Sequence, residues 1–536
     1  MAGMKGNLMI QPLNAIISVS DKTGIVDLAN GLKKIGTNII STGGTAGLLR
    51  DNNLKVKQIS DLTGFPEILN GRVKTLHPLV YGGLLADREN SEHLNTLREM
   101  TIDTIDMVVV NLYPFVDAVE KGGDPIENID IGGVSLIRAA AKNHAHVAVL
   151  TNPSQYDPIL AELEETGGIS AETRKVLAVE GFRHTAGYDA SIQAHFSNQY
   201  LQIIREHPVD MFDNEEERSY NRDFPPFLTP AYRRLRKLRY GENPHQRGAL
   251  YQEIGYNEQS VLNSNQLNGQ KLSYNNMLDF TGALNIVREF DDPTAVLIKH
   301  NNPCGVASAE NISQAYEQGL ACDPMSAFGG IIALNREVDE ETAQHIRSSF
   351  KEGVIAPSFH PDALTILKRK KKMVLLEVGK IEKITRPRFM QVEGGLLLQD
   401  PNLSGISRDD LRTVSEKVPS VEEINSMLYA WKVIKHIRSN GILLVKGTRT
   451  VGIGAGQMSR VDSSIIAARK AGEEARGSVM ASDAFIPFAD SVDVVAKAGV
   501  TAIIQPGGSI RDAEVLEKVN EFGLSMVYTG TRNFKH

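Results

Sequence analysis

The first part of the chain alternates between short apolar runs and amphipathic helical spacings. Short strands are predicted at residues 15–19, 38–41, 107–110 and 146–150, each of which contains neighbouring apolar residues. After the first run, apolar residues recur at helical spacing over residues 25–35. An alternation of strands and helices predicts a parallel sheet whose faces are covered by helices.

Residues 154–206 are predicted to be largely helical and to flank this sheet. The next stretch has no apolar period and carries Glu215-Glu216-Glu217 and Pro225-Pro226, which indicates a domain boundary. The predicted regions are a first domain over residues 1–206, a linker over residues 207–230 and a long final region over residues 231–536.

The final region is again strand-rich α/β and carries a faint internal duplication. A buried strand that ends in Lys occurs at residues 296–299 and again at residues 443–446. Each is followed by a small-residue turn that carries Phe, at residues 325–328 and 481–485. The pairs favour two copies of one fold, which we expect to divide near residues 400–425.

Composition narrows the class of protein. The chain has 536 residues, 41% hydrophobic and 23% charged, which is typical of a globular protein. Lys and Arg total 58 against 65 Asp and Glu, a net charge of −7, so we expect no general nucleic-acid partner. Because no apolar run approaches roughly 18 residues, we expect no membrane partner. Two cysteines, Cys304 and Cys322, fit a reducing cytoplasm.

Two motifs resemble well-known signatures but lack necessary parts. Residues 452–457 look like a dinucleotide fingerprint, but Gln457 stands at the sixth position. A tight turn for close backbone approach to a ligand is the favoured interpretation. Pro303-Cys304 begins like a zinc-deaminase signature, but Ala307 replaces the second cysteine, so we expect no metal site.

The first half offers anion-binding turns and titratable groups. Gly43-Gly44-Thr45 and Gly132-Gly133 each stand where a helix is predicted to begin, a position that suits phosphate. Alternatively, both glycine pairs merely permit tight turns. Asp130, Tyr113 and Lys74 could supply acid, base and oxyanion-stabilising groups. Further cations in this half are Lys22, Arg72 and Lys142.

In the second half, Lys299-His300 follows the apolar strand at residues 295–298. A Lys-His pair at the end of a strand suits an electrophile and a general base. On these residues alone, a hydrogen-bonded turn histidine is an equally open interpretation. The basic run at residues 233–239 is either a solvated helix face or a region that attracts anions.

Several longer stretches carry a resemblance to a known family. They are residues 18–24, 71–78, 111–115, 129–133 and 141–144 in the first half, and residues 239–246, 299–305, 439–440, 452–460, 482–488 and 531–534 in the second. On these stretches the chain resembles, over essentially its whole length, the bifunctional purine-biosynthesis family of AICAR transformylase/IMP cyclohydrolase.

The resemblance implies a fold, two activities and an assembly. The fold would be a methylglyoxal-synthase-like α/β parallel-sheet domain followed by two cytidine-deaminase-like α/β subdomains without zinc. One part would transfer a formyl group from the co-substrate 10-formyltetrahydrofolate to AICAR. The other would dehydrate and cyclise formyl-AICAR to IMP. No tightly bound cofactor is implied, and the chain would form a homodimer with a shared transformylase site.

The resemblance also implies roles for individual residues. The implied cyclohydrolase residues are Lys74, Tyr113, Asp130 and Lys142, with Ser18, Lys22, Gly43, Gly44, Thr45, Arg72, Thr75, Gly132 and Gly133 around the substrate. The implied transformylase residues are Lys299, His300 and Asn440 for catalysis and Arg239, Tyr240, Glu352, Arg460, Phe485 and Arg532 for binding. Thr42 and Glu352 stand where some members of the family have Ser and Asp, and both keep the functional group.

Two other functions are alternatives to this interpretation. One is a transformylase whose first domain is only structural or regulatory, and the other is a nucleotide-sensing module without catalysis. The intact Lys299-His300 pair and the set Lys74, Tyr113 and Asp130 argue against both.

Overall fold

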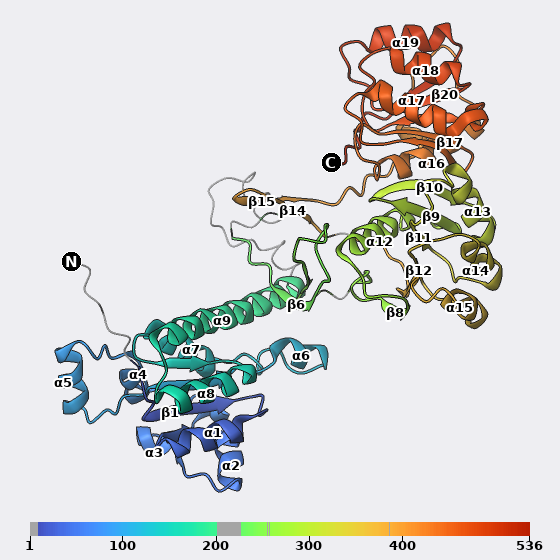
Figure 1. Ribbon diagram of the computed structural model, residues 1–536. Coiled ribbons are helices and arrows are strands. Elements are labelled where there is room, and N and C mark those ends of the chain that lie inside the picture. Colours follow the sequence, from blue (N-terminus) through green and yellow to red (C-terminus); the bar gives the residue numbers. More distant parts are fainter. Residues whose placement is uncertain (1–8, 201–223, 225–226, 255, 257, 385) are drawn as a thin grey trace. The chain divides into compact units, whose positions relative to one another are not determined.

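The computed structural model describes residues 9–200, 224, 227–254, 256, 258–384 and 386–536 (Figure 1). These residues form two compact units, one reaching Arg233 and including Glu253 and Ile254, the other formed by residues 234–252 and the chain from Tyr256 to His536. The linker predicted at residues 207–230 lies almost wholly outside the described residues, so the domain boundary there stays a prediction.

The first unit is built on a five-stranded sheet in the order β3-β2-β1-β4-β5, with every pair parallel. The strands are β1 (Asn14–Val19), β2 (Asn38–Ser41), β3 (Val56–Gln58), β4 (Met107–Asn111) and β5 (Ala148–Leu150). The helices are α1 (Ile25–Lys34), α2 (Gly43–Asp51), α3 (Ile59–Thr63), α4 (Pro78–Leu85), α5 (Ser91–Glu99), α6 (Phe115–Glu120), α7 (Gly132–Lys142), α8 (Tyr156–Thr166) and α9 (Ala171–Gln199). The predicted parallel sheet covered by helices is confirmed.

This sheet forms because its central strands are apolar on both faces. Ile16 and Ile17 of β1 and Val108 and Val109 of β4 are fully buried. Helices α7 and α9 pack together and against the β4–β5 side, while α1 packs against α8 (Figure 1). Burial on both faces explains why these strands appear in the sequence as continuous apolar runs rather than as alternating ones.

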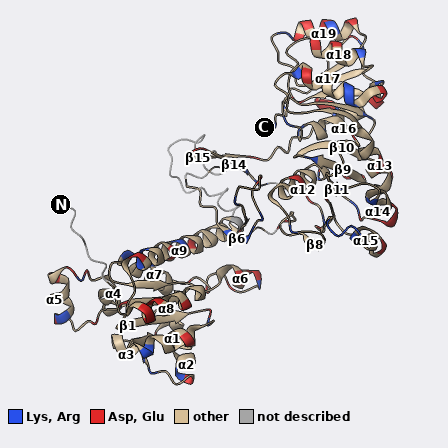
Figure 2. Cartoon of the chain, in the orientation of Figure 1, with Lys and Arg blue, Asp and Glu red and all other residues tan. Residues whose placement is uncertain are grey.

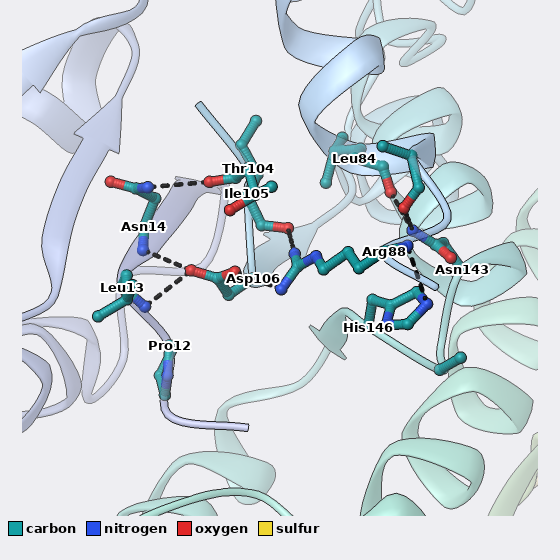
Figure 3. A network of polar contacts seen from close by, with 12 residues as sticks. Pro12, Leu13, Asn14, Leu84, Arg88, Thr104, Ile105, Asp106, Asn143 and His146 are labelled. Carbon is teal, nitrogen blue, oxygen red and sulfur yellow. Dashed lines mark hydrogen bonds and ion pairs between the residues drawn. The ribbon is translucent and has the colours of Figure 1, made fainter. Parts of the chain in front are cut away.

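A buried polar network ties together the amino ends of the strands (Figure 3). The Asp106 carboxylate accepts the N–H groups of Leu13 and Asn14, at 2.7 and 2.8 Å, and pairs with Arg88 at 2.7 Å. The ring of His146 accepts the Arg88 N–H at 3.3 Å. His146 therefore belongs to this network and not to a strand; β5 begins only at Ala148 and is shorter than the apolar run predicted.

The second unit contains a 12-stranded sheet in the order β16-β21-β20-β19-β17-β18-β10-β9-β11-β12-β13-β8. Its strands are β8 (Asn265–Asn268), β9 (Thr294–Lys299), β10 (Asn302–Ser308), β11 (Ile331–Leu334), β12 (Gly353–Ala356), β13 (Val374–Glu377), β16 (Arg412–Thr413), β17 (Ile442–Lys446), β18 (Arg449–Gly454), β19 (Val479–Ser482), β20 (Ala502–Gln505) and β21 (Ser525–Tyr528). Two ribbons stand apart, β6 (Tyr232–Lys237) with β7 (Ala249–Glu253) and β14 (Arg388–Val392) with β15 (Gly395–Gln399). The basic run at residues 233–239 is therefore mostly strand, not helix.

The two halves of this sheet repeat one topology. The hairpin β9–β10 is followed outward by β11, β12 and β13 with the same sequence of antiparallel and parallel pairs as β17–β18 followed by β19, β20 and β21. Pairing of β10 with β18 joins the halves. The faint duplication in the sequence therefore corresponds to two copies of one fold, and the two copies share a continuous sheet.

Eight helices of eight or more residues cover this sheet in the described part of the second unit. They are α12 (Tyr274–Val287), α13 (Ile312–Cys322), α14 (Glu340–Arg347), α15 (Pro361–Lys368), α16 (Val421–Ile434), α17 (Arg460–Ala471), α18 (Asp490–Lys497) and α19 (Asp512–Glu521). Helices α12 and α16 share one apolar core that includes Phe280 and Trp431. The other helices form a separate core in each half.

The glycine run at residues 452–457 has a packing role. A Cβ at Gly452 would lie 2.2 Å from the carbonyl oxygen of Ala467, and one at Gly454 would lie 2.0 Å from that of Ser463. Both carbonyls belong to α17, so the glycines allow this helix to lie directly on β18. The sequence predicted a close backbone approach to a ligand at these glycines. The structure shows instead a close approach of helix α17 to strand β18.

Charged residues of both signs are interspersed along both units (Figure 2). None of the described helices is long and apolar enough to cross a membrane. No group of three or more His, Cys, Asp or Glu side chains within the described ranges is placed to hold a metal ion.

Candidate active sites

A cavity of about 620 Å³ opens in the first unit beside the carboxyl ends of β1, β2 and β4. Segments far apart in the sequence meet there, because parallel strands deliver the loops that follow them to one edge of the sheet. Among its lining residues are Ser18, Lys22, Gly43, Gly44, Thr45, Arg72, Lys74, Thr75, Tyr113, Asp130, Gly132 and Gly133.

Two helices begin at this cavity. Helix α2 begins at Gly43 after Thr42, and α7 begins at Gly132 after Ile131. Neither preceding residue caps its helix with a side-chain hydrogen bond. The first turn of a helix has free N–H groups and the positive end of the helix dipole, which together favour an anion. The beginning of α2 therefore suits an anion, whereas at α7 the Asp130 carboxylate already accepts the Gly133 N–H.

Lys22 is held where β1 meets α2. Its ammonium donates to the Val19 carbonyl and to Thr45 Oγ1, the latter at 2.6 Å. The Thr45 hydroxyl also donates to the Val19 carbonyl at 3.1 Å, so strand and helix are joined at this point. Partial burial lowers the pKa of Lys22. A positive group is thereby fixed beside the first turn of α2.

Lys74 and Arg72 are carried by the loop that follows α3. A Cβ placed on Gly71 would lie 2.6 Å from Lys74 Cε, so the absence of a side chain lets Lys74 fold back over the loop. Lys74 Nζ lies 3.7 Å from Glu67 Oε2. Arg72 forms an ion pair with Glu127 at the rim of the cavity. Both cations therefore face carboxylates.

Asp130 is the acidic group nearest the start of α7. Its Oδ1 accepts the Gly133 N–H at 2.7 Å. Burial raises the pKa of Asp130, and the charge of Lys74 offsets part of that rise. A carboxyl group with a raised pKa beside an ammonium is typical of a site for proton transfer. Tyr113, half exposed, lies at the mouth of the same cavity.

In the second unit, β9 ends at Lys299 and the chain turns sharply into β10. Lys299 Nζ donates to the carbonyls of Phe328 and Gly329, at 3.2 and 2.9 Å. His300 and Asn301 both have left-handed backbone conformations, with φ of 50° and 59°. The Asn301 N–H donates to Asp279 at 2.6 Å, which fixes the turn. His300 is exposed on this turn beside Lys299.

Arg460 links Asn440 to a buried carboxylate. Arg460 donates from Nη2 to Asn440 Oδ1 at 2.8 Å, and from Nη1 to Ser482 Oγ at 3.0 Å and to Asp483. Asp483 is fully buried and also accepts the Gly441 N–H at 3.0 Å. Arg460 is 7% exposed, so in this structure it orients Asn440 rather than facing solvent.

The remaining predicted transformylase residues have local contacts. The guanidinium of Arg239 lies over the Tyr240 ring at 5.5 Å, and that of Arg532 lies over Phe534 at 4.5 Å. Glu352 accepts a hydrogen bond from Asn276 at 2.7 Å. Phe485 is 41% exposed. These contacts do not test the binding roles predicted for them.

Comparison with known proteins identifies the family. A family model described as AICARFT/IMPCHase bienzyme matches residues 140–470, and one described as MGS-like domain matches residues 24–135. The bifunctional purine biosynthesis protein PurH of Acetivibrio thermocellus is 50% identical, over 97% of this chain and 99% of its own length. The protein of the same name from Bacillus cytotoxicus is 47% identical, with the same coverage.

The chain belongs to the AICARFT/IMPCHase bienzyme family. Most of the residues that line the cavity of the first unit lie within the region that the MGS-like model matches, and the Lys299-His300 turn lies within the region that the bienzyme model matches. The family resemblance inferred from the sequence motifs is confirmed. The structure separates the two groups of predicted residues between the two units.

One of the predicted cyclohydrolase residues, Lys142, does not line the cavity of the first unit. Lys142 is the last residue of α7, which has 11 residues and starts at the cavity with Gly132. At about 1.5 Å per residue, the two ends of such a helix lie roughly 15 Å apart. The catalytic role of Lys142 stays a prediction that rests on the resemblance alone.

The cavity also contains functional groups that were not singled out. Asn111 Oδ1 accepts the N–H groups of Ser20 and Asp21, at 2.6 and 2.8 Å, and shapes the loop that carries Lys22. Glu127 faces Arg72. Asn111 was within a family motif, and its polar side chain at the end of an apolar strand was a usable signal. Nothing in the sequence indicated the pairing of Glu127 with Arg72.

Proposed function

We infer that this chain is a bifunctional enzyme of purine biosynthesis. It transfers a formyl group to AICAR and then dehydrates and cyclises formyl-AICAR to IMP. The observation that carries this function is the cavity of the first unit, where the beginnings of α2 and α7 meet Lys74 and Asp130 in a chain that belongs to the bienzyme family.

For ring closure, we propose that the substrate phosphate binds the beginning of α2 with Lys22 and Thr45, and that Ser18, Arg72 and Thr75 complete the phosphate and ribose contacts. The carboxamide nitrogen then attacks the formyl carbon, and the former carbonyl oxygen gains negative charge. The Lys74 ammonium stabilises that oxygen. Asp130 and Tyr113 exchange protons with the attacking nitrogen and the departing oxygen, which leaves as water.

For formyl transfer, we propose that His300 accepts a proton from the amine of AICAR as the amine attacks the formyl carbon. This amine needs a base because its lone pair is delocalised into the ring. Lys299 already donates to two carbonyls, and its ammonium has a third hydrogen for the developing oxyanion. The bond between the formyl carbon and the folate nitrogen then breaks, and that nitrogen takes up the proton that His300 accepted. Asn440, held by Arg460, orients the substrates.

The formyl donor, the location and the assembly are finer proposals. We propose 10-formyltetrahydrofolate as the donor, a cytoplasmic location, and a homodimer that shares the transformylase site. The β14–β15 ribbon supports a subunit contact, because it exposes Phe389, Met390, Leu396 and Leu397. Such a patch is typical of an interaction surface. Sedimentation of the purified protein tests the dimer, and a monomer at assay concentration would exclude it.

One absorbance assay tests both activities. Release of tetrahydrofolate and closure of the purine ring change ultraviolet absorbance differently, so each step is followed with AICAR and 10-formyltetrahydrofolate present. We expect both signals from one protein preparation. Tetrahydrofolate release without IMP would reduce the chain to a transformylase. The absence of both signals would leave a nucleotide-binding protein without catalysis.

A further inference from the structure

Tyr188 connects α9 to the loop that carries Asp130. Its hydroxyl accepts the Asp130 N–H at 2.7 Å and donates to the Asn128 carbonyl at 2.9 Å. A phenol hydroxyl has one hydrogen and can also accept, so both capacities are used. Tyr188 does not line the cavity and was not among the residues predicted from the sequence.

Asp130 is held at two points, its carboxylate and its backbone N–H. Its carboxylate is tied to the first turn of α7 through the Gly133 N–H, and its backbone is tied to α9 through Tyr188. The segment between α6 and α7 contains turns rather than regular structure. Removing the Tyr188 hydroxyl would leave one backbone donor and one acceptor of this loop without that partner. The direction of the Asp130 side chain would then depend on the loop and on the remaining Gly133 bond.

The ring of Tyr188 reaches a second catalytic segment. It packs edge-on against Phe115, with ring centroids 6.4 Å apart and planes at 75°. Phe115 is 3% exposed and stands two residues after Tyr113. A single side chain of α9, a helix that lies alongside α7 (Figure 1), thus contacts the segments of both Asp130 and Tyr113.

We propose that Tyr188 is a positioning residue for ring closure, which holds the Asp130 loop in its reactive geometry through two hydrogen bonds to the backbone. This inference rests on the proposed assignment of ring closure to the cavity of the first unit. Tyr188 acts through Asp130 and exchanges no proton with the substrate. Burial and the charge of Asp130 raise the pKa of Tyr188 to about 12, although the bond to the backbone of Asp130 works against that rise.

The test is Tyr188→Phe in the full-length protein, which keeps the ring contact with Phe115. We expect kcat for supplied formyl-AICAR to fall about tenfold or more, the effect of losing two ordinary hydrogen bonds that position a reacting group. Affinity for IMP, measured by calorimetry, should change much less. Formyl transfer in the second unit is the internal control. Tyr200→Phe, at the C-terminal end of α9, is the matched control variant.

A pH profile separates positioning from a purely structural role. Asp130 is faced by Lys74 from its loop, by Tyr188 from α9 and by Tyr81 from α4. Both tyrosines remain neutral in the assay range, since burial raises the pKa of each to about 12. A loosened loop hydrates Asp130 and lowers its pKa. The acidic limb of kcat/KM should therefore move to lower pH in Tyr188→Phe and stay in place in Tyr200→Phe.

Each outcome decides the proposal. A Tyr188→Phe protein with normal ring closure and an unshifted pH profile would overturn it. Loss of IMP binding together with activity would show that Tyr188 maintains the fold of the cavity, which also overturns a positioning role. If the unmodified protein fails to close the ring at all, the proposed function of the first unit is wrong, and the variant is not the cause.

Discussion

Arg460 joins Asn440 to Asp483: one guanidinium nitrogen donates to the amide oxygen of Asn440, and the other donates to the buried carboxylate. The Arg460–Asp483 pair is almost completely withdrawn from water. Charge pairs in this setting are sensitive to the loss of either partner. The Asn440 amide also donates to the carbonyls of Gln457 and Met458, each at 3.0 Å. Its oxygen is held by Arg460, a residue for which the sequence suggested a substrate contact.

Arg460→Lys tests this relationship. A lysine ammonium can still pair with Asp483, but it has no second nitrogen for Asn440. Losing a charge-assisted hydrogen bond of about 1.5–3 kcal/mol corresponds to a roughly 10- to 100-fold fall in formyl transfer. Steady-state kinetics of both reactions measures the effect. Arg469→Lys, on the exposed side of α17, should behave as wild type, and an equally slow Arg469→Lys would show a general defect of the helix.

Lys74→Ala should abolish most ring closure and leave formyl transfer intact. The ammonium of Lys74 lies near Glu67 and Asp130, where it can stabilise the oxyanion. Loss of one preorganised donor costs about 10²–10³ in rate. Formyl-AICAR should accumulate, which chromatography of the reaction mixture detects. Lys121→Ala, an exposed lysine after α6, is the control. IMP formation at the normal rate in Lys74→Ala would remove Lys74 from the mechanism.

His300→Asn should lower formyl transfer by about 10²–10⁴, the usual range for one general base. Asparagine suits this position because His300 has φ of 50°, a conformation that asparagine tolerates better than alanine. Turnover and AICAR affinity are measured separately, together with ring closure of supplied formyl-AICAR. We expect normal ring closure. A loss confined to AICAR affinity would make His300 a binding residue.

Asp130→Asn should stabilise the first unit at neutral pH while it abolishes ring closure. Burial raises the folded-state pKa of Asp130, so between its ordinary value of 3.8 and the raised value the folded protein binds more protons than the unfolded chain. Stability is therefore lost as pH rises through this window. The neutral amide avoids that loss and can still accept the Gly133 N–H.

Thermal unfolding at several pH values checks this result. The gain in melting temperature of Asp130→Asn over wild type should be present at pH 7 and vanish below about pH 3.8, where the wild-type carboxyl is protonated in both states. Asp27→Asn, on the exposed part of α1, should show no such pH-dependent gain. An Asp130→Asn protein that is less stable at pH 7 would mean that the carboxylate contributes net stabilisation.

Most local elements of the first unit and the family could be predicted from the sequence alone. Continuous apolar runs predicted β1, β2 and β4, because strands buried on both faces have no polar alternation. The glycine pairs at 43–44 and 132–133 marked the beginnings of α2 and α7 correctly. These features depend on residues that are close in the chain, so local pattern was sufficient.

Contacts between groups far apart in the chain could be seen only in the folded structure. It placed His146 in a polar network instead of a strand, since that side chain is satisfied by segments roughly 60 residues away. In the structure, Arg460 donates to Asn440, and Tyr188 accepts a hydrogen bond from the Asp130 loop. Lys142 lies at the end of α7 that is away from the cavity. Pairing of β10 with β18 also merges the two copies of the second unit into one sheet. Such pairings arise from the packing of whole elements, which spacing along a chain does not encode.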